Sequence, residues 1–354
     1  MAYLQGSDSS RLYSKQALNH RLPVAPTSSG HSPLTHRPPP LTHLKAMTRN
    51  TASILLLILL TGPIPVTWAQ AEKQSGVDFK RLALLGGSAA ALRHLGYEYV
   101  DRAWYQGHKQ DSIRWINDWS GETYVNLDKG GHFIAGLYLS QNLQEAYGWS
   151  GFSPRQAALL GTITSWAALL EIEMRDAYFA EWGFSIPDFV ANTLGASVPL
   201  VHAFFPASQV LNFKFSYFPS SLYLDRRQRQ ADQRPFTAHA IDDYEGMTFW
   251  LTLAVDRVLP KRLAARWPDY MGLALGYSAR GLHGSNVKSR GPNKFFPDRP
   301  DARPQVLLGL DWDTRQLPGR GPFWRHLKKQ LNWIHWPSPA LRLYPDLRFY
   351  LLYL

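Results

Sequence analysis

The pattern of apolar and polar positions divides the chain into a helical first half and a strand-rich second half. Apolar segments within residues 78–205 are separated by turn residues, and they predict four helices. The third of these, residues 157–170, contains no charged side chain over fourteen residues. That length is too short for a bilayer span, which takes about 20 residues, and is typical of a buried core helix. We therefore expect a domain resembling a four-helix bundle over residues 78–205.

Local signals place the starts of these helices. The second helix should begin near Asp128, and Ser153 and Ser185 should cap the third and fourth, each followed by a proline in the first turn. The small residues at 86–91 in the first helix would let another helix approach closely.

Residues 206–354 show a different pattern, in which large apolar or aromatic residues alternate with small or polar ones. Alternation of this kind predicts strands, and three or four of them would form a small antiparallel sheet. A complete outer-membrane barrel needs at least about eight strands, so we do not expect one here. The predicted strands are 212–218, 270–278, 305–313 and 347–354.

Other segments of this half are predicted as helices or loops. Residues 244–259 are interpreted as a helix ending before a proline, and 226–235 and 280–304 as exposed loops. The basic, tryptophan-bearing segment 325–336 is interpreted as an amphipathic helix packed on the sheet, with a position at a lipid surface as the alternative. The predicted fold class is therefore α+β, mainly α, with an α/β extension over 206–354.

The first seventy residues are predicted to lie outside the folded protein. Residues 1–46 are rich in Pro, Ser, Thr and His and should be disordered. Residues 47–69 have a short basic start, an apolar run and small residues before Gln70, which are the features of a secretory signal peptide. We expect translation to start at Met47. The mature protein should then work in the periplasm or at the outer membrane of a bacterium.

Composition narrows the classes of function. The net charge is +11, but residues 1–69 hold six basic side chains and one acidic one, leaving 32 basic against 26 acidic residues. This mild excess lacks the basic stripe of nucleic-acid binding, and it suits an envelope protein near anionic lipid. The absence of cysteine excludes disulfides, thiolate metal sites and a cysteine nucleophile. The 13 Trp, 17 Tyr and 17 Phe suit a packed core or a membrane interface.

Polar residues recur at helical spacing inside three of the predicted helices. Residues three or four apart share one helix face, so three polar stripes can converge on one buried cluster. An isolated charge in such apolar surroundings would be costly, and its partners should therefore lie in the other stripes. The pairs are Asp128 with His132, Glu173 with Asp176, and Asp188 with Asn192.

The predicted roles differ among these residues. His132 would be a general base, and Glu173 and Asp176 would complete a catalytic group, with Asp188 as a further acid or orienting residue. Equally, the same histidine and carboxylates could ligate a divalent metal, although the sequence requires no cofactor. The remaining predicted binding residues are Asp128, Lys129, Asp188 and Asn192.

Each residue also has a purely structural interpretation. Asp128 would cap its helix with Lys129 in the exposed first turn, and Asp188 would favour the positive end of the helix dipole. Asn192 and Gly195 would only permit close packing, and Glu171 would be solvated.

Four separated motifs resemble one bacterial family. They are Asp128-Lys129-x-x-His132-Phe133, Glu173-x-x-Asp176, Glu181-Trp182-Gly183-Phe184-Ser185, and Asp188-x-x-Ala191-Asn192-x-x-Gly195-Ala196. In this order they resemble the family of predicted periplasmic proteins typified by YfiM, and they are similar in order to the motifs of the VanZ family. The resemblance covers residues 78–205. Ala177 stands where the family usually has glycine, and the lipobox cysteine of its lipoprotein members is absent. The resemblance implies export but no particular activity.

Two functions are compatible with these observations. The first is a structural or binding role at the cell envelope, in which the polar cluster fixes helix packing or holds a lipid or glycan headgroup. The second is a hydrolase or transferase acting on an envelope lipid or glycan through His132 with Glu173, Asp176 or Asp188. Membrane association is expected in either case.

Overall fold

The computed structural model describes residues 76–103, 105, 109–121, 124–180, 182–220, 224, 243–282 and 302–354. The chain divides into two compact units, residues 1–57 and 58–354, and all described residues belong to the second. The predicted disordered segment, the signal peptide, the loop at 226–235 and most of the loop at 280–304 lie outside the described residues.

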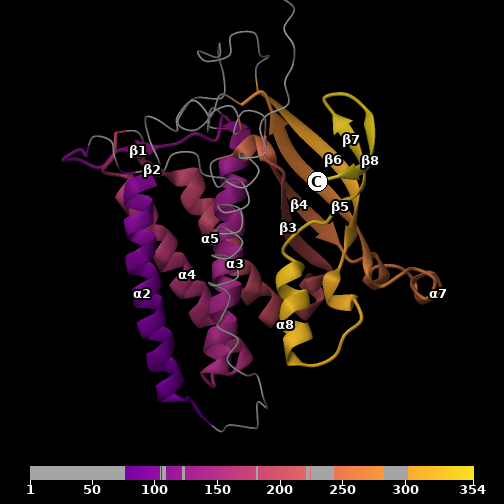
Figure 1. Ribbon diagram of the computed structural model, residues 1–354, viewed down its shortest axis with the longest axis horizontal. Helices are drawn as coiled ribbons and strands as arrows, with labels where there is room; N and C mark the ends of the chain where they lie inside the picture. Colours follow the sequence, from indigo (N-terminus) through magenta and orange to yellow (C-terminus); the bar gives the residue numbers. More distant parts are fainter. Residues whose placement is uncertain are drawn as a thin grey trace, which may run out of the picture. The chain divides into compact units, whose positions relative to one another are not determined.

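Long helices form the first part of the described chain, as the apolar pattern predicted (Figure 1). They are α2 (Phe79–Ala103), α3 (Leu127–Trp149), α4 (Pro154–Asp176) and α5 (Ile186–Phe204). The predicted caps are confirmed. Ser153 and Gln156 form a capping box at the start of α4, and the Ser185 hydroxyl accepts a hydrogen bond of 3.3 Å from the Asp188 amide at the start of α5.

Helix α3 packs closely against α4 and α5 because glycines replace side chains at the contacts. A Cβ atom added at Gly195 of α5 would lie 1.9 Å from the Phe133 carbonyl oxygen of α3. One added at Gly161 of α4 would lie 2.7 Å from the Ser140 carbonyl oxygen. The predicted packing role of Gly195 is therefore confirmed, and it brings the polar stripes of α3, α4 and α5 within reach of one another.

Helix α2 makes a different kind of contact. A Cβ atom added at Gly86 or Gly87 would meet nothing within 4 Å, so the close approach of another helix at 86–91 is not found among the described residues. Arg93 of α2 instead forms an ion pair with Glu171 of α4, which is therefore paired rather than simply solvated.

Helix α4 is long and apolar enough to cross a bilayer by length and composition alone, and 33% of its most apolar window is buried within the protein. The core helix of a folded domain satisfies the same criterion, and α4 does pack on α3 and α5.

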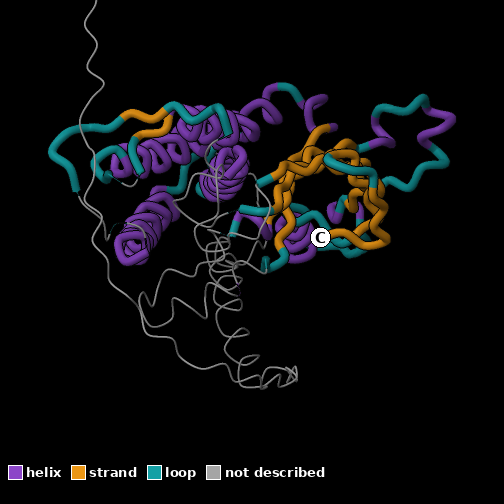
Figure 2. The backbone as a smooth tube through the Cα atoms, turned by 90° about the horizontal axis from the view of Figure 1, so that it is seen from above, coloured by secondary structure: helices purple, strands orange, loops and turns teal. Residues whose placement is uncertain are grey.

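A six-stranded antiparallel sheet fills the second half, with the strands in chain order from β3 to β8. Figure 2 shows the strands following a strongly curved path. Four strands were predicted close to their observed positions, and β4 and β7 were not. The strands are β3 (Leu211–Tyr217), β4 (Met247–Leu253), β5 (Met271–Arg280), β6 (Arg303–Trp312), β7 (Ser338–Tyr344) and β8 (Arg348–Tyr353).

The predicted helix at 244–259 is wrong, since its centre is strand β4. Thr248, Trp250 and Thr252 are buried and alternate with partly or fully exposed apolar residues, which is the period of a strand. β-branched and aromatic residues at alternate positions favour a strand over a helix. The expected sheet of three or four strands is correspondingly too small.

The basic segment near the C-terminus contains a helix, α8 (Pro322–Leu331), as predicted. Besides its place beside the sheet, this helix contacts α3, because Lys329 and His326 both pair with Glu145. Directly after α8, the chain runs along the outer edge of β3, where the Phe215 amide donates to the Trp333 carbonyl at 3.1 Å. The C-terminal segment thus connects the helices to the sheet.

A short helix α7 (Lys261–Ala264) links β4 to β5, and a two-stranded parallel pair forms beside the helices. In this pair β1 (Trp115–Ile116) lies next to β2 (Phe184–Ser185). The mixture of helices and strands confirms the α+β class, while the bundle-like arrangement of the first domain stays a prediction. The β1–β2 pair matters for function because it brings the connector before α3 to the start of α5.

Candidate functional site

The chain enters α3 through a strained left-handed turn. Tyr124, Val125 and Asn126 have φ angles of 45°, 55° and 65°, although none is glycine. Left-handed backbone costs roughly 1–2 kcal/mol per residue for such side chains. The sheet holds the turn in place, because the Tyr277 hydroxyl of β5 donates to the Val125 carbonyl at 2.6 Å and Tyr124 is buried beside Leu282. The turn determines where the first residues of α3 point.

Lys129, in the first turn of α3, lies among three carboxylates. Its Nζ is 2.5 Å from Asp118 Oδ2, 2.7 Å from Asp128 Oδ2 and 3.3 Å from Asp188 Oδ1. The first two contacts are hydrogen bonds, whereas Asp188 is within ion-pair distance without hydrogen-bond geometry. The Lys129 side chain is 8% exposed, so its charge is shielded from water and balanced within the protein. We call Lys129, Asp118, Asp128 and Asp188 the lysine cluster.

The structural interpretation of Asp128 and Lys129 is wrong. The N-cap of α3 is Asn126, whose side chain makes no capping bond, and Asp128 lies inside the first turn. Both Asp128 and Lys129 are buried. The local pattern suggested a capped, exposed start because it contained no sign of the partners that arrive from β1 and α5.

Asp118 was not predicted as a site residue. It lies in the connector after β1, where no helical spacing marks it, and the Ser185 hydroxyl donates to its Oδ1 at 3.1 Å. Ser185, interpreted only as a cap, therefore both starts α5 and holds a carboxylate of the lysine cluster. The only available signal is that Asp118 is the one charged residue of the aromatic-rich connector Trp115–Trp119.

His132, one turn after Asp128, contacts the second polar group of the site. Its Nδ1 lies 3.2 Å from Asn192 Oδ1, and the Asn192 amide nitrogen donates to Glu173 Oε1 at 2.9 Å. His132 Nδ1 is also 3.4 Å from Glu173 Oε1, and Nε2 is 3.8 Å from Asp188 Oδ2. The imidazole is 26% exposed, against 2% for the Glu173 side chain. His132 is thus the member of this group that a ligand can reach.

Burial sets the charge of Glu173. Desolvation, with smaller contributions from Asp188 and Asp176, raises the pKa of Glu173 to about 9. A neutral carboxyl results at neutral pH, so its contact with His132 belongs to a hydrogen-bond network rather than to an ion pair. Asn192 connects the two: if His132 Nδ1 donates to the Asn192 carbonyl oxygen, the amide nitrogen donates onward to Glu173.

The lysine cluster has its own balance. Burial and the neighbouring Asp188 raise the pKa of Asp128 to about 7, although Lys129 opposes this shift. For Lys129, burial alone would lower the pKa, but Asp128 and Asp188 outweigh it and the pKa is raised. Lys129 therefore stays charged, and no part of its charge remains for an anionic ligand.

The Asp176 side chain bonds to Tyr105 and not to His132. Its carboxylate accepts a hydrogen bond of 2.5 Å from the Tyr105 hydroxyl, and burial raises the pKa of Asp176 to about 7 despite this bond. Tyr105 is a second residue that the sequence did not predict as part of the site. It is buried, and desolvation raises its pKa. The structure thus brings His132 together with Glu173, Asp188 and Asn192, while Asp176 acts on them only through its charge.

The predicted metal site does not fit this geometry. Across the described residues, no group of three or more His, Asp or Glu side chains is arranged to hold a metal ion. Of the proposed ligands His132, Glu173 and Asp176, the last accepts a hydrogen bond from Tyr105, and Glu173 accepts one from Asn192. These side chains have partners within the protein, so we derive no step that uses a metal.

One family model matches the part of the chain that contains the site. Residues 115–203, from β1 to the end of α5, match the family described as "Predicted periplasmic lipoprotein (DUF2279)". No curated protein and no solved structure matches the chain. The match confirms the predicted location, exported to the periplasm or associated with the outer membrane. The finer resemblance to YfiM and VanZ stays a prediction. The sequence contains no cysteine.

Proposed function

We propose that this exported envelope protein binds the polar part of an envelope lipid or glycan at His132. The lysine cluster would be the structural part of the site, and His132 with Asn192 and Glu173 the binding part. The observation that carries the proposal is the contrast in exposure, because His132 is 26% exposed whereas Glu173 and Lys129 are nearly enclosed. One accessible imidazole is held in a rigid polar frame.

The charges of the site favour one kind of ligand. Lys129 is already balanced by Asp118, Asp128 and Asp188, so no cation remains for a phosphate group. Asp188 lies beside His132 Nε2 and adds negative charge at the entrance. Sugar hydroxyls or the amine of an ethanolamine headgroup would meet acceptors here, whereas an isolated phosphate would be repelled.

Calorimetric titration of the full chain with a chito-oligosaccharide and with glycerophosphoethanolamine tests this proposal. We expect one of them to bind to the wild type and the affinity to fall at least about tenfold in H132Q, as loss of one hydrogen bond to a charged or polar group implies. His94 is an exposed histidine on α2, and H94Q is the matched control, which should bind as the wild type does. Equal affinities of H132Q and H94Q, or binding of neither probe by the wild type, would contradict the proposal.

A second candidate is a hydrolase or transferase on the same class of ligand. The observation in its favour is that His132 Nδ1 lies 3.2 Å from Asn192 Oδ1 and 3.4 Å from Glu173 Oε1, because a base is usually oriented by a third group of this kind. His132 would accept a proton from the attacking hydroxyl, with Glu173 acting through Asn192 to orient the ring.

Mass spectrometry of an envelope lipid and glycan extract incubated with the protein separates the two candidates. A product that forms with the wild type and H94Q but not with H132Q supports catalysis. Binding without any change of mass in the extract supports the binding role alone.

A further inference from the structure

The two faces of the sheet carry the reverse of the usual distribution of side chains, with apolar residues outside and polar residues inside. One-sided antiparallel sheets usually place apolar residues toward the core and polar residues toward water. Here the outward positions carry a row of leucines in direct register across five strands. Leu251 pairs with Leu275, Leu275 with Leu308, Leu308 with Leu341, and Leu341 with Phe349.

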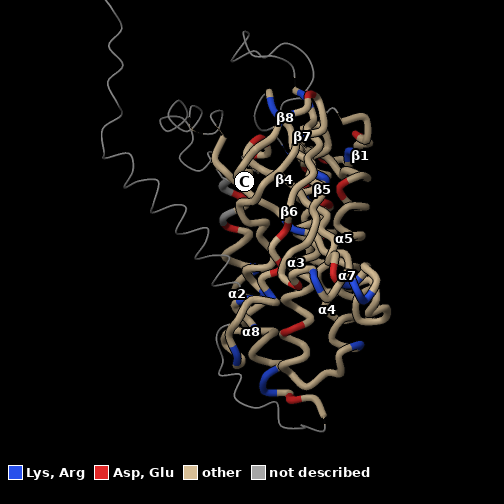
Figure 3. Tube along the Cα trace, turned by 90° about the vertical axis from the view of Figure 1, so that its right-hand side faces the viewer, with Lys and Arg blue, Asp and Glu red and all other residues tan. Residues whose placement is uncertain are grey.

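A second row, formed by Leu253, Leu273 and Leu310, lies beside the first. Together the two rows make one surface, which we call the leucine face. Leu275 is 49% exposed, Leu308 42% and Phe349 64%, so the described part of the chain leaves this surface uncovered. Figure 3 shows correspondingly long uncharged stretches along the strands.

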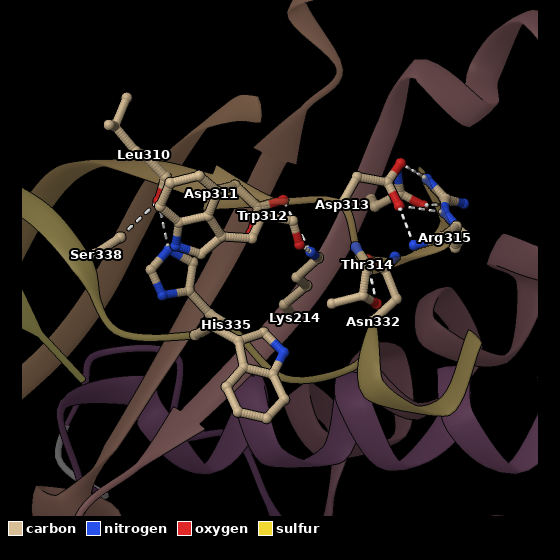
Figure 4. A network of polar contacts seen from close by, with 12 residues as sticks. Lys214, Leu310, Asp311, Trp312, Asp313, Thr314, Arg315, Asn332, His335 and Ser338 are labelled. Atoms are coloured by element: carbon tan, nitrogen blue, oxygen red, sulfur yellow. Dashed lines mark hydrogen bonds and ion pairs between the residues drawn. The ribbon is translucent and has the colours of Figure 1, made fainter. Parts of the chain in front are cut away.

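The inner face of the same strands holds the polar residues. Lys214 Nζ of β3 lies 2.8 Å from Asp311 Oδ2 of β6, and both side chains are buried (Figure 4). His335 stacks on Trp250 with ring centroids 3.9 Å apart and approaches the Leu310 carbonyl at 2.9 Å. Because side chains alternate along a strand, a slip of one residue would exchange the two faces. In the observed register the charged side chains are buried and the leucines lie on the outer face.

We propose that the leucine face lies in the acyl-chain layer of a lipid bilayer. Polar-inside and apolar-outside alternation is the pattern of strands that face lipid. The apolar rows also have the right height and borders. From Met271 to Tyr277 strand β5 rises about 20 Å at about 3.4 Å per residue, close to the apolar band of about 25 Å in membrane barrels. Aromatic rings mark both limits, with Tyr270 and Trp312 stacked at one end and Tyr344, which is 51% exposed, at the other.

His132 belongs to none of the strands that form the leucine face, so the inference goes beyond the proposed function and does not depend on it. A bilayer fits better than a second copy of the chain for a chemical reason. The two rows of the leucine face contain only apolar side chains. Protein interfaces instead combine an apolar centre with hydrogen-bonding groups. Export also places the protein beside the envelope membranes, where such a face can be covered.

The absence of cysteine makes the test direct, since any introduced cysteine is the only thiol of the full chain. We would label L308C and L275C with an environment-sensitive fluorophore and add vesicles of phosphatidylethanolamine and phosphatidylglycerol. We expect the emission of both labels to shift to the blue and to be quenched by nitroxides placed on the acyl chains. The matched control is L263C, because Leu263 of α7 is 52% exposed but lies outside the leucine face.

A charge in the face should release the protein from lipid. L308R should lower partitioning into the vesicles by at least about tenfold, whereas L263R should not. Circular dichroism checks that both variants are folded. Equal quenching at positions 308 and 263 would overturn the inference. So would light scattering that shows a dimer without lipid in the wild type and a monomer in L308R, since a second copy would then cover the face.

Discussion

At the scale of single residues, Glu173 shows how burial rather than a partner decides the state of a charged group. Its side chain is 2% exposed and accepts a hydrogen bond from Asn192, which a carboxylate and a carboxyl can both do. Desolvation favours the neutral form and raises the pKa of Glu173 to about 9. The folded protein therefore retains a proton that the unfolded chain releases near its usual pKa of 4.5.

We predict that E173Q removes a pH dependence of stability. Because the folded state binds the extra proton, the contribution of Glu173 to the free energy of unfolding should be full below pH 4.5 and fall as the pH rises to about 9. Glutamine keeps an acceptor for Asn192 but cannot ionise, so this fall should become shallower in E173Q. Denaturant titrations across this pH range measure it. E171Q is the control, since Glu171 is 40% exposed with its pKa lowered by the hydrogen bond from Arg93. An unchanged slope in E173Q would show that Glu173 is charged in the folded protein.

The strained turn gives a second prediction for a single residue. Val125 adopts φ 55°, and a β-branched side chain is particularly unfavourable in this region. V125G should therefore raise the free energy of unfolding by about 1 kcal/mol, measured from the denaturation midpoint. V201G is the control at an exposed helical position of α5, where glycine should destabilise by a few tenths of a kcal/mol. Destabilisation by V125G would mean that packing of the Val125 side chain stabilises the fold by more than the left-handed backbone strain costs.

Helical spacing predicted part of the candidate site but could not predict its partners. His132, Glu173, Asp188 and Asn192 were grouped because each lies on an apolar helix, and their contacts confirm that these side chains meet. Asp118 could not be predicted in this way because it lies in a connector. The position of this connector depends on the pairing of β1 with β2, a strand far along the chain. No local pattern contains that long-range pairing.

At the scale of elements, glycines determine how closely the helices approach. G195A would place a Cβ atom 1.9 Å from the Phe133 carbonyl oxygen, so α3 and α5 would have to separate. We predict a loss of about 1–3 kcal/mol in the free energy of unfolding, measured by chemical denaturation. G87A on α2 is the matched control, because nothing lies within 4 Å of the added atom and alanine favours a helix by roughly 0.5–1 kcal/mol. Equal effects of the two variants would mean that α5 can shift without loss.

Strands were harder to predict than helices for reasons that particular residues show. Strand β7 contains Pro339, and proline usually counts against a strand because it lacks the amide donor. Here Pro339 lies at a register shift between β7 and β8, where a donor is not needed. Strand β4 is predicted as a helix because Phe249, Trp250 and Leu251 are consecutive apolar residues. The inward Trp250 thus interrupts the alternation that Thr248 and Thr252 would otherwise show.

At the scale of the whole described unit, α3 is the element that joins the helices to the sheet. Its Tyr138 ring stacks on Trp333 with centroids 4.0 Å apart, and the hydroxyl donates to the Trp333 carbonyl at 2.5 Å. Phe133 packs on Phe213 of β3 at 4.6 Å. These contacts cross the predicted boundary between residues 78–205 and 206–354, and they suggest that the two parts unfold together.

We therefore predict that Y138A destabilises helices and strands by the same amount. Truncating a large aromatic side chain at such a contact should lower the free energy of unfolding by about 3–5 kcal/mol. Hydrogen exchange followed by mass spectrometry can measure amides of α4 and β5 separately, and both should lose protection equally. In Y147A, the matched control, only contacts among the helical segments are lost, since Tyr147 packs on Phe152 and bonds to Thr164. If Y138A weakened the strands alone, the two parts would be independent domains, and the sheet could enter a bilayer without disturbing the site at His132.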